Sequence, residues 1–505
     1  MQHQISQLIA TLKAANLFIE TTNITSTENS AELALSSITF DSRKVTPGTL
    51  FCCKGATFHP EYLKDAEAAG ATAYLAEKIY PEIKIPGIIV SDIRKAMPIA
   101  GQFIYDNVQD KVTSLAITGT KGKSTTVFLT RAIIDEWLRA TGHPGAAIIS
   151  SIRTYDGVID EESHITTPEA LDLLDHFRNI EKTGITHLVL ETSSQALKYD
   201  RVAGINFAAS AFLNIGNDHV SPIEHTSFDD YLDSKLELFK QSETACICSS
   251  TAHYDRVYKA AKTSAKKVLT FGTNPNDDVF LSNIRSTPAG LEFHVKSELY
   301  DLDIKFPMHG AFNVENAGAA ISLCQTLKVP AEFIVSGLAK AKAIGRMELF
   351  SSLNRELEIV VDYAHNQLSF EAVLSGMRKD YPDRNIVVIF GCAGGKSQAR
   401  RREIPEVINK FADYAIVSED DSYFEPFADI AADITKHLEI DHEVIQSREE
   451  ALNAALGKFS APVILLAGKG DETYAAIGGE YVPIRSDLEL AAEAIERFNN
   501  QANGE

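Results

Sequence analysis

An apolar run that ends in a glycine-rich turn constrains this chain more than any other stretch. Residues 115–118 are strand-like, a helical pattern begins near residue 124, and the turn between them consists of Gly119, Thr120, Lys121, Gly122, Lys123, Ser124 and Thr125. Glycines let backbone N–H groups face anionic oxygens, a lysine adds positive charge, and a hydroxyl can bind Mg²⁺. The stretch therefore predicts an ATP phosphate loop, with an ordinary glycine turn as the alternative. The strict Walker motif requires glycine where Ile117 stands.

Length and charge limit the remaining possibilities. A chain of 505 residues exceeds what one hydrophobic core usually organises, so we predict about three domains, at residues 1–110, 111–345 and 346–505. The net charge of −21 argues against a nucleic-acid partner. Because the start of the chain lacks the features of a signal peptide and no later stretch reaches the length of a membrane span, we expect no membrane association.

The six cysteines point to a reducing compartment. They stand at positions 52, 53, 246, 248, 324 and 392, mostly among apolar residues, and form no C-x-x-C pair. We interpret them as reduced, buried side chains of a cytoplasmic protein. Cys246 and Cys248 could in principle hold a metal, but their spacing is more typical of one face of a buried strand.

Strands alternate with helices after residue 112, which predicts a mostly parallel sheet with its ligand site at the carboxyl ends of the strands. Polar side chains follow two of these strands: Glu191 after the first, and Asn214, Asp218 and His219 after the second. A carboxylate beside a phosphate loop is well placed to hold Mg²⁺. Lys235, within an amphipathic helix at 231–240, is by itself a surface lysine.

A second set of strand-to-loop junctions occurs near residues 362, 391, 418 and 468, which predicts another doubly wound sheet. None has the Gly-x-Gly-x-x-Gly pattern of dinucleotide binding. The arginines at 400–402 are either a solvated face or a carboxylate clamp. The predicted fold is thus α/β: a smaller N-terminal α/β domain, a central P-loop domain with a parallel sheet, and a Rossmann-like C-terminal domain.

The motifs together resemble the Mur ligases, the ATP-dependent amino-acid-adding enzymes of bacterial cell-wall precursor synthesis. That family uses Gly-Thr-x-Gly-Lys-[Ser/Thr]-Thr, which accounts for Ile117. Four further motifs match in order: Asn-x-x-x-Asp-His at 214–219, Phe-Asn-x-x-Asn at 312–316, Gly-Arg-Met-Glu at 345–348 and Asp-Tyr-Ala-His at 362–365. The resemblance implies an N-terminal domain for a UDP-sugar, a central ATPase domain and a C-terminal domain for the incoming amino acid.

The resemblance also implies roles for individual residues. Lys123, Glu191, His219 and Lys235 would be catalytic, and Ser124, Glu191, His219 and Lys235 would hold Mg²⁺. Lys235 matches a lysine that carries a carbamate in this family, a modification that turns an ammonium into a potential metal ligand. The ATP site would comprise residues 119–125 together with Asn313, Asn316, Arg346 and Asp362.

Further matches favour the members that add the third residue of the peptide. The resemblance implies contacts to the UDP-muramoyl-peptide from Ser42, Thr166, Thr167, Ser193 and Arg201, with residues 56–59 also near the uridine nucleotide. It implies contacts to the incoming amino acid from Arg401, Asp420, Asp421, Gly468 and Glu472. The implied substrates are UDP-N-acetylmuramoyl-L-alanyl-D-glutamate, L-lysine and ATP, and we expect a monomer.

Departures from the family pattern bear on the amino acid. Members that add diaminopimelate carry Asp-Asn-Pro-Arg, whose arginine grips the distal carboxylate, where this chain has Asp420, Asp421, Ser422 and Tyr423. An added carboxylate without the arginine suits an ammonium-ended side chain, so we predict L-lysine over diaminopimelate. L-Ornithine stays open, because one methylene is worth only about 1–3 kcal/mol. Asp471, where the family has histidine, adds further negative charge.

The expected mechanism is formation of an acyl phosphate followed by attack of the amino acid's amine, with a hinge near residues 342–346. Two alternatives remain open. A folylpolyglutamate synthase-like ligase shares the central chemistry but is disfavoured by the full domain ahead of the phosphate loop. A catalytically silent, Mur-like binding protein is disfavoured by the joint presence of Lys123, Glu191, His219 and Lys235.

Overall fold

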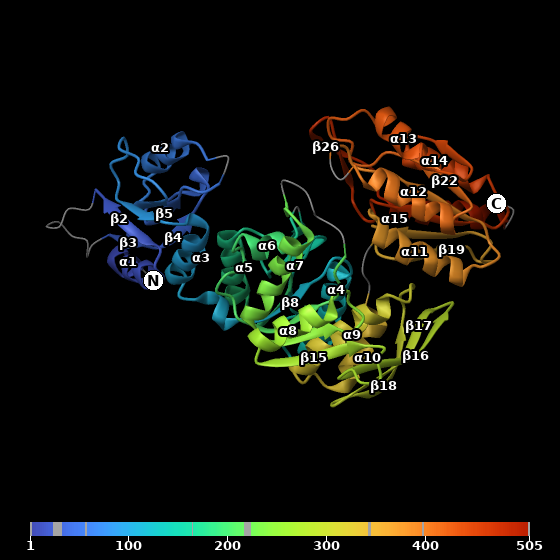
Figure 1. Cartoon of the computed structure of the whole chain (residues 1–505), viewed down its shortest axis with the longest axis horizontal. Helices are drawn as coiled ribbons and strands as arrows, with labels where there is room; N and C mark the ends of the chain where they lie inside the picture. The colour runs from blue at the N-terminus through green and yellow to red at the C-terminus, as the bar shows by residue number, and fades with distance from the viewer. Residues whose placement is uncertain are drawn as a thin grey trace. The chain divides into compact units, whose positions relative to one another are not determined.

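A computed structural model describes residues 3–23, 33–55, 58–163, 165–216, 224–341, 345–395 and 398–502. It divides into two compact units, one formed by residues 1–271 with 319–333 and the other by residues 272–318 with 334–505. Three sheets of five or more strands dominate the architecture (Figure 1). The predicted three-part α/β fold is confirmed, whereas the exact domain boundaries stay a prediction.

The N-terminal sheet has the strand order β2-β7-β6-β5-β4. The strands span Phe18–Thr22 (β2), Ser37–Thr39 (β4), Thr49–Cys52 (β5), Ala73–Ala76 (β6) and Gly87–Val90 (β7). All pair in parallel except β2, which is antiparallel to β7. Helices α1 (Ile5–Ala14), α2 (Pro60–Ala68) and α3 (Ile93–Ile104) accompany it. Strand-like runs at residues 48–53 and 71–75 of the sequence predicted β5 and β6, but β2, β4 and β7 were not predicted, because strands of three to five residues carry little periodicity of their own.

The central sheet supports the phosphate loop. Six strands run parallel in the order β9-β12-β8-β13-β14-β15, with β8 near the middle. They span Thr113–Thr118 (β8), Ala147–Ile149 (β9), His187–Glu191 (β12), Phe207–Phe212 (β13), Ser242–Cys248 (β14) and Lys267–Gly272 (β15), and β10 (Arg153–Tyr155) and β11 (Asp160–Glu162) add an antiparallel edge. Helices α4 (Lys123–Ala140), α5 (Ala170–Thr183), α6 (Ser194–Lys198), α7 (Phe228–Leu236) and α8 (Tyr254–Ser264) alternate with these strands. Buried apolar strands with helical crossovers are the expected signature of such a sheet.

The N-terminal sheet and the central sheet share one hydrophobic core within the first unit. Helix α3 packs against α5, and their buried side chains belong to a single apolar cluster. Polar contacts reinforce the packing: Gln102 donates to the carbonyl of Ala203 at 2.6 Å, and the Arg94 guanidinium lies 4.2 Å from the ring centre of Tyr199. The predicted boundary at residue 110 therefore does not separate two independent cores.

The second unit contains an antiparallel meander and the C-terminal sheet. Strands β16 (Val279–Thr287), β17 (Gly290–Ser297) and β18 (Asp301–Phe306) form the meander, and helices α9 (Asn313–Thr326) and α10 (Ala331–Lys340) follow along the chain. The C-terminal sheet has the order β19-β20-β24-β21-β22-β23, parallel except for β19. Its strands span Glu348–Ser351 (β19), Glu358–Asp362 (β20), Ile386–Phe390 (β21), Tyr414–Val417 (β22), His442–Val444 (β23) and Val463–Ala467 (β24).

Separate hydrophobic clusters cover the two faces of the C-terminal sheet. Helices α11 (Gln367–Asp380), α12 (Arg400–Phe411) and α13 (Phe427–Thr435) contribute to one, and α14 (Arg448–Leu456) and α15 (Asp487–Ala502) to the other. A hairpin, β25 (Tyr474–Ile477) and β26 (Glu480–Pro483), follows β24. This arrangement confirms the doubly wound sheet that the four strand-to-loop junctions predicted.

Two predictions about the environment of the chain can be compared with the structure. All six cysteines are buried, as predicted, and no disulfide joins any of them in the described part of the chain. None of the helices within the described ranges has both the length and the apolar composition that crossing a membrane requires.

Candidate functional site

The glycine-rich turn joins β8 to α4 as a tight loop. Gly122 has a φ of +81°, in the left-handed region that favours glycine, and the helix begins at the next residue. A Cβ on Gly119 would lie 3.0 Å from the Cβ of Leu213, so the loop backbone packs directly against the end of β13. Predicted loop residues 119–125 thus lie together at one strand-to-helix junction, where helix N-termini attract anions.

Asn214, which follows the neighbouring strand β13, is hydrogen-bonded to this loop. Its backbone carbonyl accepts from the Thr120 N–H at 2.9 Å, its side-chain oxygen accepts from the Lys121 N–H at 2.8 Å, and its amide nitrogen donates to the Lys121 carbonyl at 3.1 Å. The sequence placed Asn214 at the same sheet edge as the loop, and the contacts explain the family motif that begins there. A loop held on both sides needs little reordering when a phosphate binds.

Glu191 lies at the centre of the polar groups below the loop. Its carboxylate, only 2% exposed, accepts from the Ser124 hydroxyl at 2.9 Å and lies 3.8 Å from the Lys123 ammonium. Ser151 also donates to it, from its backbone N–H at 3.0 Å and its hydroxyl at 3.2 Å. Ser151 was not predicted, although its place directly after the β9 region was a usable signal.

This donor set fits a magnesium ion. A carboxylate and a hydroxyl beside a phosphate loop are oxygen ligands of the kind that Mg²⁺ prefers. His219, Asp218 and the rest of 217–223 lie outside the described residues. Among the residues that the structure does describe, no three His, Cys, Asp or Glu side chains are grouped so that they could hold a metal.

Lys235 lies in the interior, which corrects the interpretation as a surface lysine. Its side chain is 1% exposed, and its ammonium donates to the carbonyl of Gly119 at 2.9 Å and lies 4.7 Å from the ring centre of Tyr231. The Tyr231 hydroxyl is hydrogen-bonded to Thr120 at 3.0 Å. Helical periodicity alone did not indicate which face of α7 packs on the phosphate loop, and tertiary packing decided it.

The residues predicted for the UDP-muramoyl-peptide lie in part beside this site. The Thr167 hydroxyl donates to the Glu191 carbonyl at 2.8 Å and accepts from the Ser193 N–H at 3.1 Å, while Arg201 donates to the Thr167 carbonyl at 3.1 Å. Thr166 is adjacent in sequence. Ser42 begins a short 3₁₀ helix after β4 in the N-terminal sheet, and residues 56–57 of the predicted uridine segment lie outside the described residues.

Lys54, which was not predicted from the sequence, joins the predicted Arg201 in extending this region. Glu169 forms an ion pair with Arg201 at 2.8 Å and another with Lys54, which follows the N-terminal strand β5. The Lys54 ammonium also lies 4.9 Å from the ring centre of Phe40. Two cations thus meet where the N-terminal and central sheets share their core, a suitable environment for an anionic substrate in this acidic chain.

The second unit holds the other predicted nucleotide residues. Asn313 and Asn316, one turn apart at the start of α9, are hydrogen-bonded to each other at 2.8 Å, and Asn313 donates to the carbonyl of His309 at 2.7 Å. Asp362, at the end of β20, accepts from the Met347 N–H at 2.8 Å. That contact joins the Gly-Arg-Met-Glu and Asp-Tyr-Ala-His motifs. Most of the predicted hinge, residues 342–344, lies outside the described residues.

Acidic residues surround a buried lysine after β22 and β24. The Lys469 ammonium, 1% exposed, lies 3.0 Å from Asp421 Oδ1 and 2.5 Å from Glu472 Oε2. Burial alone would lower the pKa of Lys469, but Asp420, Glu472 and Asp421 raise it above its usual value. Gly468 precedes it with a φ of +106°. Lys469 was not among the predicted site residues, although it stands between Gly468 and Gly470 at a predicted strand-to-loop junction.

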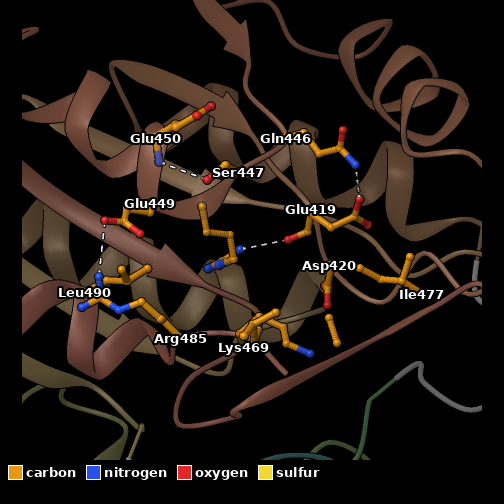
Figure 2. Close-up of a pocket in the computed structure, with 13 residues that line it drawn as sticks. Glu419, Asp420, Gln446, Ser447, Glu449, Glu450, Lys469, Ile477, Arg485 and Leu490 are labelled. Carbon is orange, nitrogen blue, oxygen red and sulfur yellow. Dashed lines mark hydrogen bonds and ion pairs between the residues drawn. The ribbon is translucent and has the colours of Figure 1, made fainter. Parts of the chain in front are cut away.

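A cavity of about 500 Å³ opens beside this cluster. Its charged lining includes Glu419, Asp420, Glu449, Glu450, Arg448, Lys469 and Arg485 (Figure 2). Arg485 forms ion pairs with Glu449 and Glu493, and Arg448 forms one with Asp487. The positive charges of both arginines are therefore already balanced by carboxylates of the chain. Burial raises the pKa of Asp420. The acidic side chains of the lining therefore favour a cationic ligand group over an anionic one.

Arg401 lies within the chain's own ion-pair network. It is 4% exposed and contacts Glu425 at 2.6 and 2.7 Å and Asp433 at 3.1 Å. The side-chain hydrogen bonds from Arg401 lower the pKa of Glu425 to about 2. Arg402 is exposed and pairs with Glu406 at 3.4 Å. The arginines at 400–402 are therefore not simply a solvated face, since Arg401 is buried and already paired with carboxylates of the chain. The role of this cluster as a clamp for a substrate carboxylate stays a prediction.

Comparison with known proteins agrees with this geometry. Residues 117–324 match the Mur ligase middle domain, and residues 345–470 match the Mur ligase glutamate ligase domain. The UDP-N-acetylmuramoyl-L-alanyl-D-glutamate--L-lysine ligase of Streptococcus thermophilus is 36% identical over 458 residues, which cover 90% of this chain and 92% of that protein.

Solved structures share the fold. A UDP-N-acetylmuramoyl-L-alanyl-D-glutamate--2,6-diaminopimelate ligase covers 99% of both chains with a TM-score of 0.66 at 24% identity. A Mycobacterium tuberculosis folylpolyglutamate synthase, complexed with ADP and AMPPCP, covers 74% of this chain and 91% of its own with a TM-score of 0.58 at 15% identity. The fold, the phosphate loop and the family matches define an ATP-dependent, amide-forming ligase. The chain belongs to the Mur ligase family.

Proposed function

We propose that this enzyme joins L-lysine to the side-chain carboxylate of D-glutamate in UDP-N-acetylmuramoyl-L-alanyl-D-glutamate, a step of peptidoglycan precursor synthesis in the cytoplasm. The acidic cavity beside Asp420 carries the choice of lysine, and the relatives named as L-lysine ligases support it. The burial of all six cysteines agrees with reduced side chains in that compartment. We expect the enzyme to act as a monomer.

The reaction would proceed in two steps. The D-glutamate carboxylate attacks the γ-phosphorus of ATP, which breaks the bond to the β-phosphate oxygen and yields an acyl phosphate and ADP. The α-amine of lysine then attacks the acyl carbon, and inorganic phosphate leaves as the amide forms. Lys123 would stabilise the charge on the transferred group, and its position 3.8 Å from Glu191 supports this role.

The remaining assignments follow the contacts around the loop. Ser124, Glu191, His219 and Lys235, the last as a carbamate, would hold Mg²⁺, which when bound neutralises phosphate oxygens. Residues 119–125 would bind the phosphates, and Asn313, Asn316, Arg346 and Asp362 the rest of the nucleotide. Thr166, Thr167, Ser193, Arg201 and Ser42 would contact the UDP-muramoyl-peptide, which the proximity of Thr167 and Ser193 to Glu191 supports.

The charge balance near Lys469 supports Asp420 as the partner of the lysine ε-ammonium. Asp421 and Glu472 already share the Lys469 ammonium. Asp420 lines the cavity, and the described residues supply it with no ion pair shorter than 4.0 Å. A distal carboxylate would meet this negative charge and be repelled. Arg401 and Glu472, with Gly468, would bind the α-carboxylate and α-amine.

Phosphate release with UDP-muramoyl-dipeptide, ATP and one amino acid at a time tests the proposal. We expect turnover with L-lysine, a smaller kcat/KM with L-ornithine and none above background with diaminopimelate, because the cavity favours an ammonium end. Turnover with diaminopimelate alone would refute the choice of lysine. No turnover with any of the three would refute the proposed substrates and leave the silent binding protein as the alternative.

The Asp420→Asn variant tests the assigned partner of the ε-ammonium. We expect the KM for lysine to rise at least about 10-fold with an unchanged KM for ATP, since a charged hydrogen bond is lost. Because burial raises the pKa of Asp420, wild-type KM for lysine should also rise as the pH falls toward that pKa, and the variant should lose this dependence. Glu450→Gln, which removes an exposed carboxylate from the same cavity, is the control. Equal effects of the two substitutions would contradict the assignment.

A further inference from the structure

Three segments of the C-terminal domain meet at the ring of Tyr363. The Tyr363 hydroxyl donates to Glu472 Oε1 at 2.8 Å, and the guanidinium of Arg346 lies 4.2 Å from the centre of the same ring. We propose that Tyr363 is a positioning residue that orients the Glu472 carboxylate toward the incoming amino acid and couples it to the nucleotide residue Arg346. The proposal rests on the proposed function, since it deepens the roles of those two side chains.

Backbone packing fixes the three segments around the ring. Tyr363 donates its N–H to the Gly345 carbonyl at 3.1 Å. Gly470 has a φ of +56°, and a Cβ there would lie 3.0 Å from the Gly345 oxygen and 3.3 Å from the Tyr363 Cβ. Gly345 has a φ of +66°, and its Cβ would lie 2.6 Å from the Asp471 nitrogen. Only glycines allow this close approach, so a shift of one segment must be transmitted to the others.

Glu472 is held from two sides. Tyr363 donates to Oε1, while the Lys469 ammonium lies 2.5 Å from Oε2. Burial raises the pKa of Tyr363 well above its usual value, so its hydroxyl remains a donor across the working pH range. A carboxylate with a separate donor on each oxygen has a fixed orientation before the substrate arrives, which reduces the entropic cost of binding.

The two side chains that contact Tyr363, Arg346 and Glu472, are assigned to different substrates. Arg346 is one of the predicted nucleotide residues, and its guanidinium interacts with the tyrosine ring through a cation–π contact. Glu472 is one of the predicted amino-acid residues. Because a single ring supports both, binding of a nucleotide and binding of lysine should each strengthen the other by the same factor.

Two substitutions separate the hydroxyl from the ring. In Tyr363→Phe the ring under Arg346 remains but the bond to Glu472 is lost, so the KM for lysine should rise about 10-fold with an unchanged KM for ATP. In Tyr363→Leu both are lost, so the KM values for lysine and ATP should rise together. Tyr381→Phe is the matched control, because it removes a half-buried tyrosine hydroxyl that is hydrogen-bonded to a glutamate, Glu358, in the same domain.

Calorimetric titration of lysine, with and without bound ADP, measures the coupling directly. We expect ADP to tighten lysine binding in the wild type and in Tyr381→Phe and to have no effect in Tyr363→Leu. The stoichiometry of ADP binding, which a weaker affinity does not change, reports the fraction of folded variant. An unchanged KM for lysine in Tyr363→Phe, or an equal rise of both KM values, would overturn the proposal. An inactive wild type would instead refute the proposed substrates.

Discussion

Lys235→Ala is expected to lose all but about 0.1–1% of wild-type turnover, the loss typical of removing one charged group from a phosphate-transfer site. Lys235 is buried against the phosphate loop, and its ammonium donates to the Gly119 carbonyl. Removal of the side chain would empty the space between α7 and the loop that carries Lys123. The measurement is phosphate release at saturating substrates, and wild-type rates from this variant would show that Lys235 is not needed.

Chemical rescue identifies the form in which Lys235 acts. If it acts as a carbamate, acetate or propionate should restore part of the activity of the alanine variant, because a small carboxylate can replace the missing anion. If it acts as an ammonium that donates to the Gly119 carbonyl, ethylamine should restore activity and the acids should not. Lys240→Ala, which removes an exposed lysine paired with Glu237, is the control and should be fully active.

Asp487→Ala should destabilise the C-terminal domain by about 3–5 kcal/mol, the usual cost of leaving a buried charge without its partner. The Asp487 carboxylate accepts from two nitrogens of Arg448 at 2.8 and 2.5 Å, and both residues are buried. Arg448 also donates to the carbonyl of Ala467 at 3.0 Å. The pair therefore joins the first residues of α14 and α15 to the end of β24.

Hydrogen–deuterium exchange of the β24 and α14 amides measures this loss as faster local opening. The double substitution Arg448→Met with Asp487→Leu should recover most of the stability, because an apolar pair of similar volume carries no desolvation cost. Glu493→Ala, which breaks the exposed pair with Arg485, should leave the exchange unchanged. Equal exchange rates in Asp487→Ala and Glu493→Ala would contradict the prediction.

Much of the fold was accessible from the sequence, because periodicity and motif spacing are local signals. The turn at 119–125, the strands that end at Glu191 and Asp362, and the buried cysteines lie where predicted. Short strands such as β2 and β7 were missed, since runs of four or five residues show too little alternation to identify. The shared core of the N-terminal and central sheets depends on contacts between α3 and α5, which are distant in sequence.

The sequence by itself determined the class of site: a phosphate loop, acidic strand ends and a family of motifs fixed in order. Only the tertiary structure decided which charges match each other. In the structure Lys235 is buried and donates to the Gly119 carbonyl, although the sequence alone suggested a surface lysine. Arg401 pairs with Glu425, and Lys469 lies between Asp421 and Glu472. The physical reason is that pairing of charges depends on distances of a few ångströms between residues far apart along the chain, and no local pattern encodes those distances.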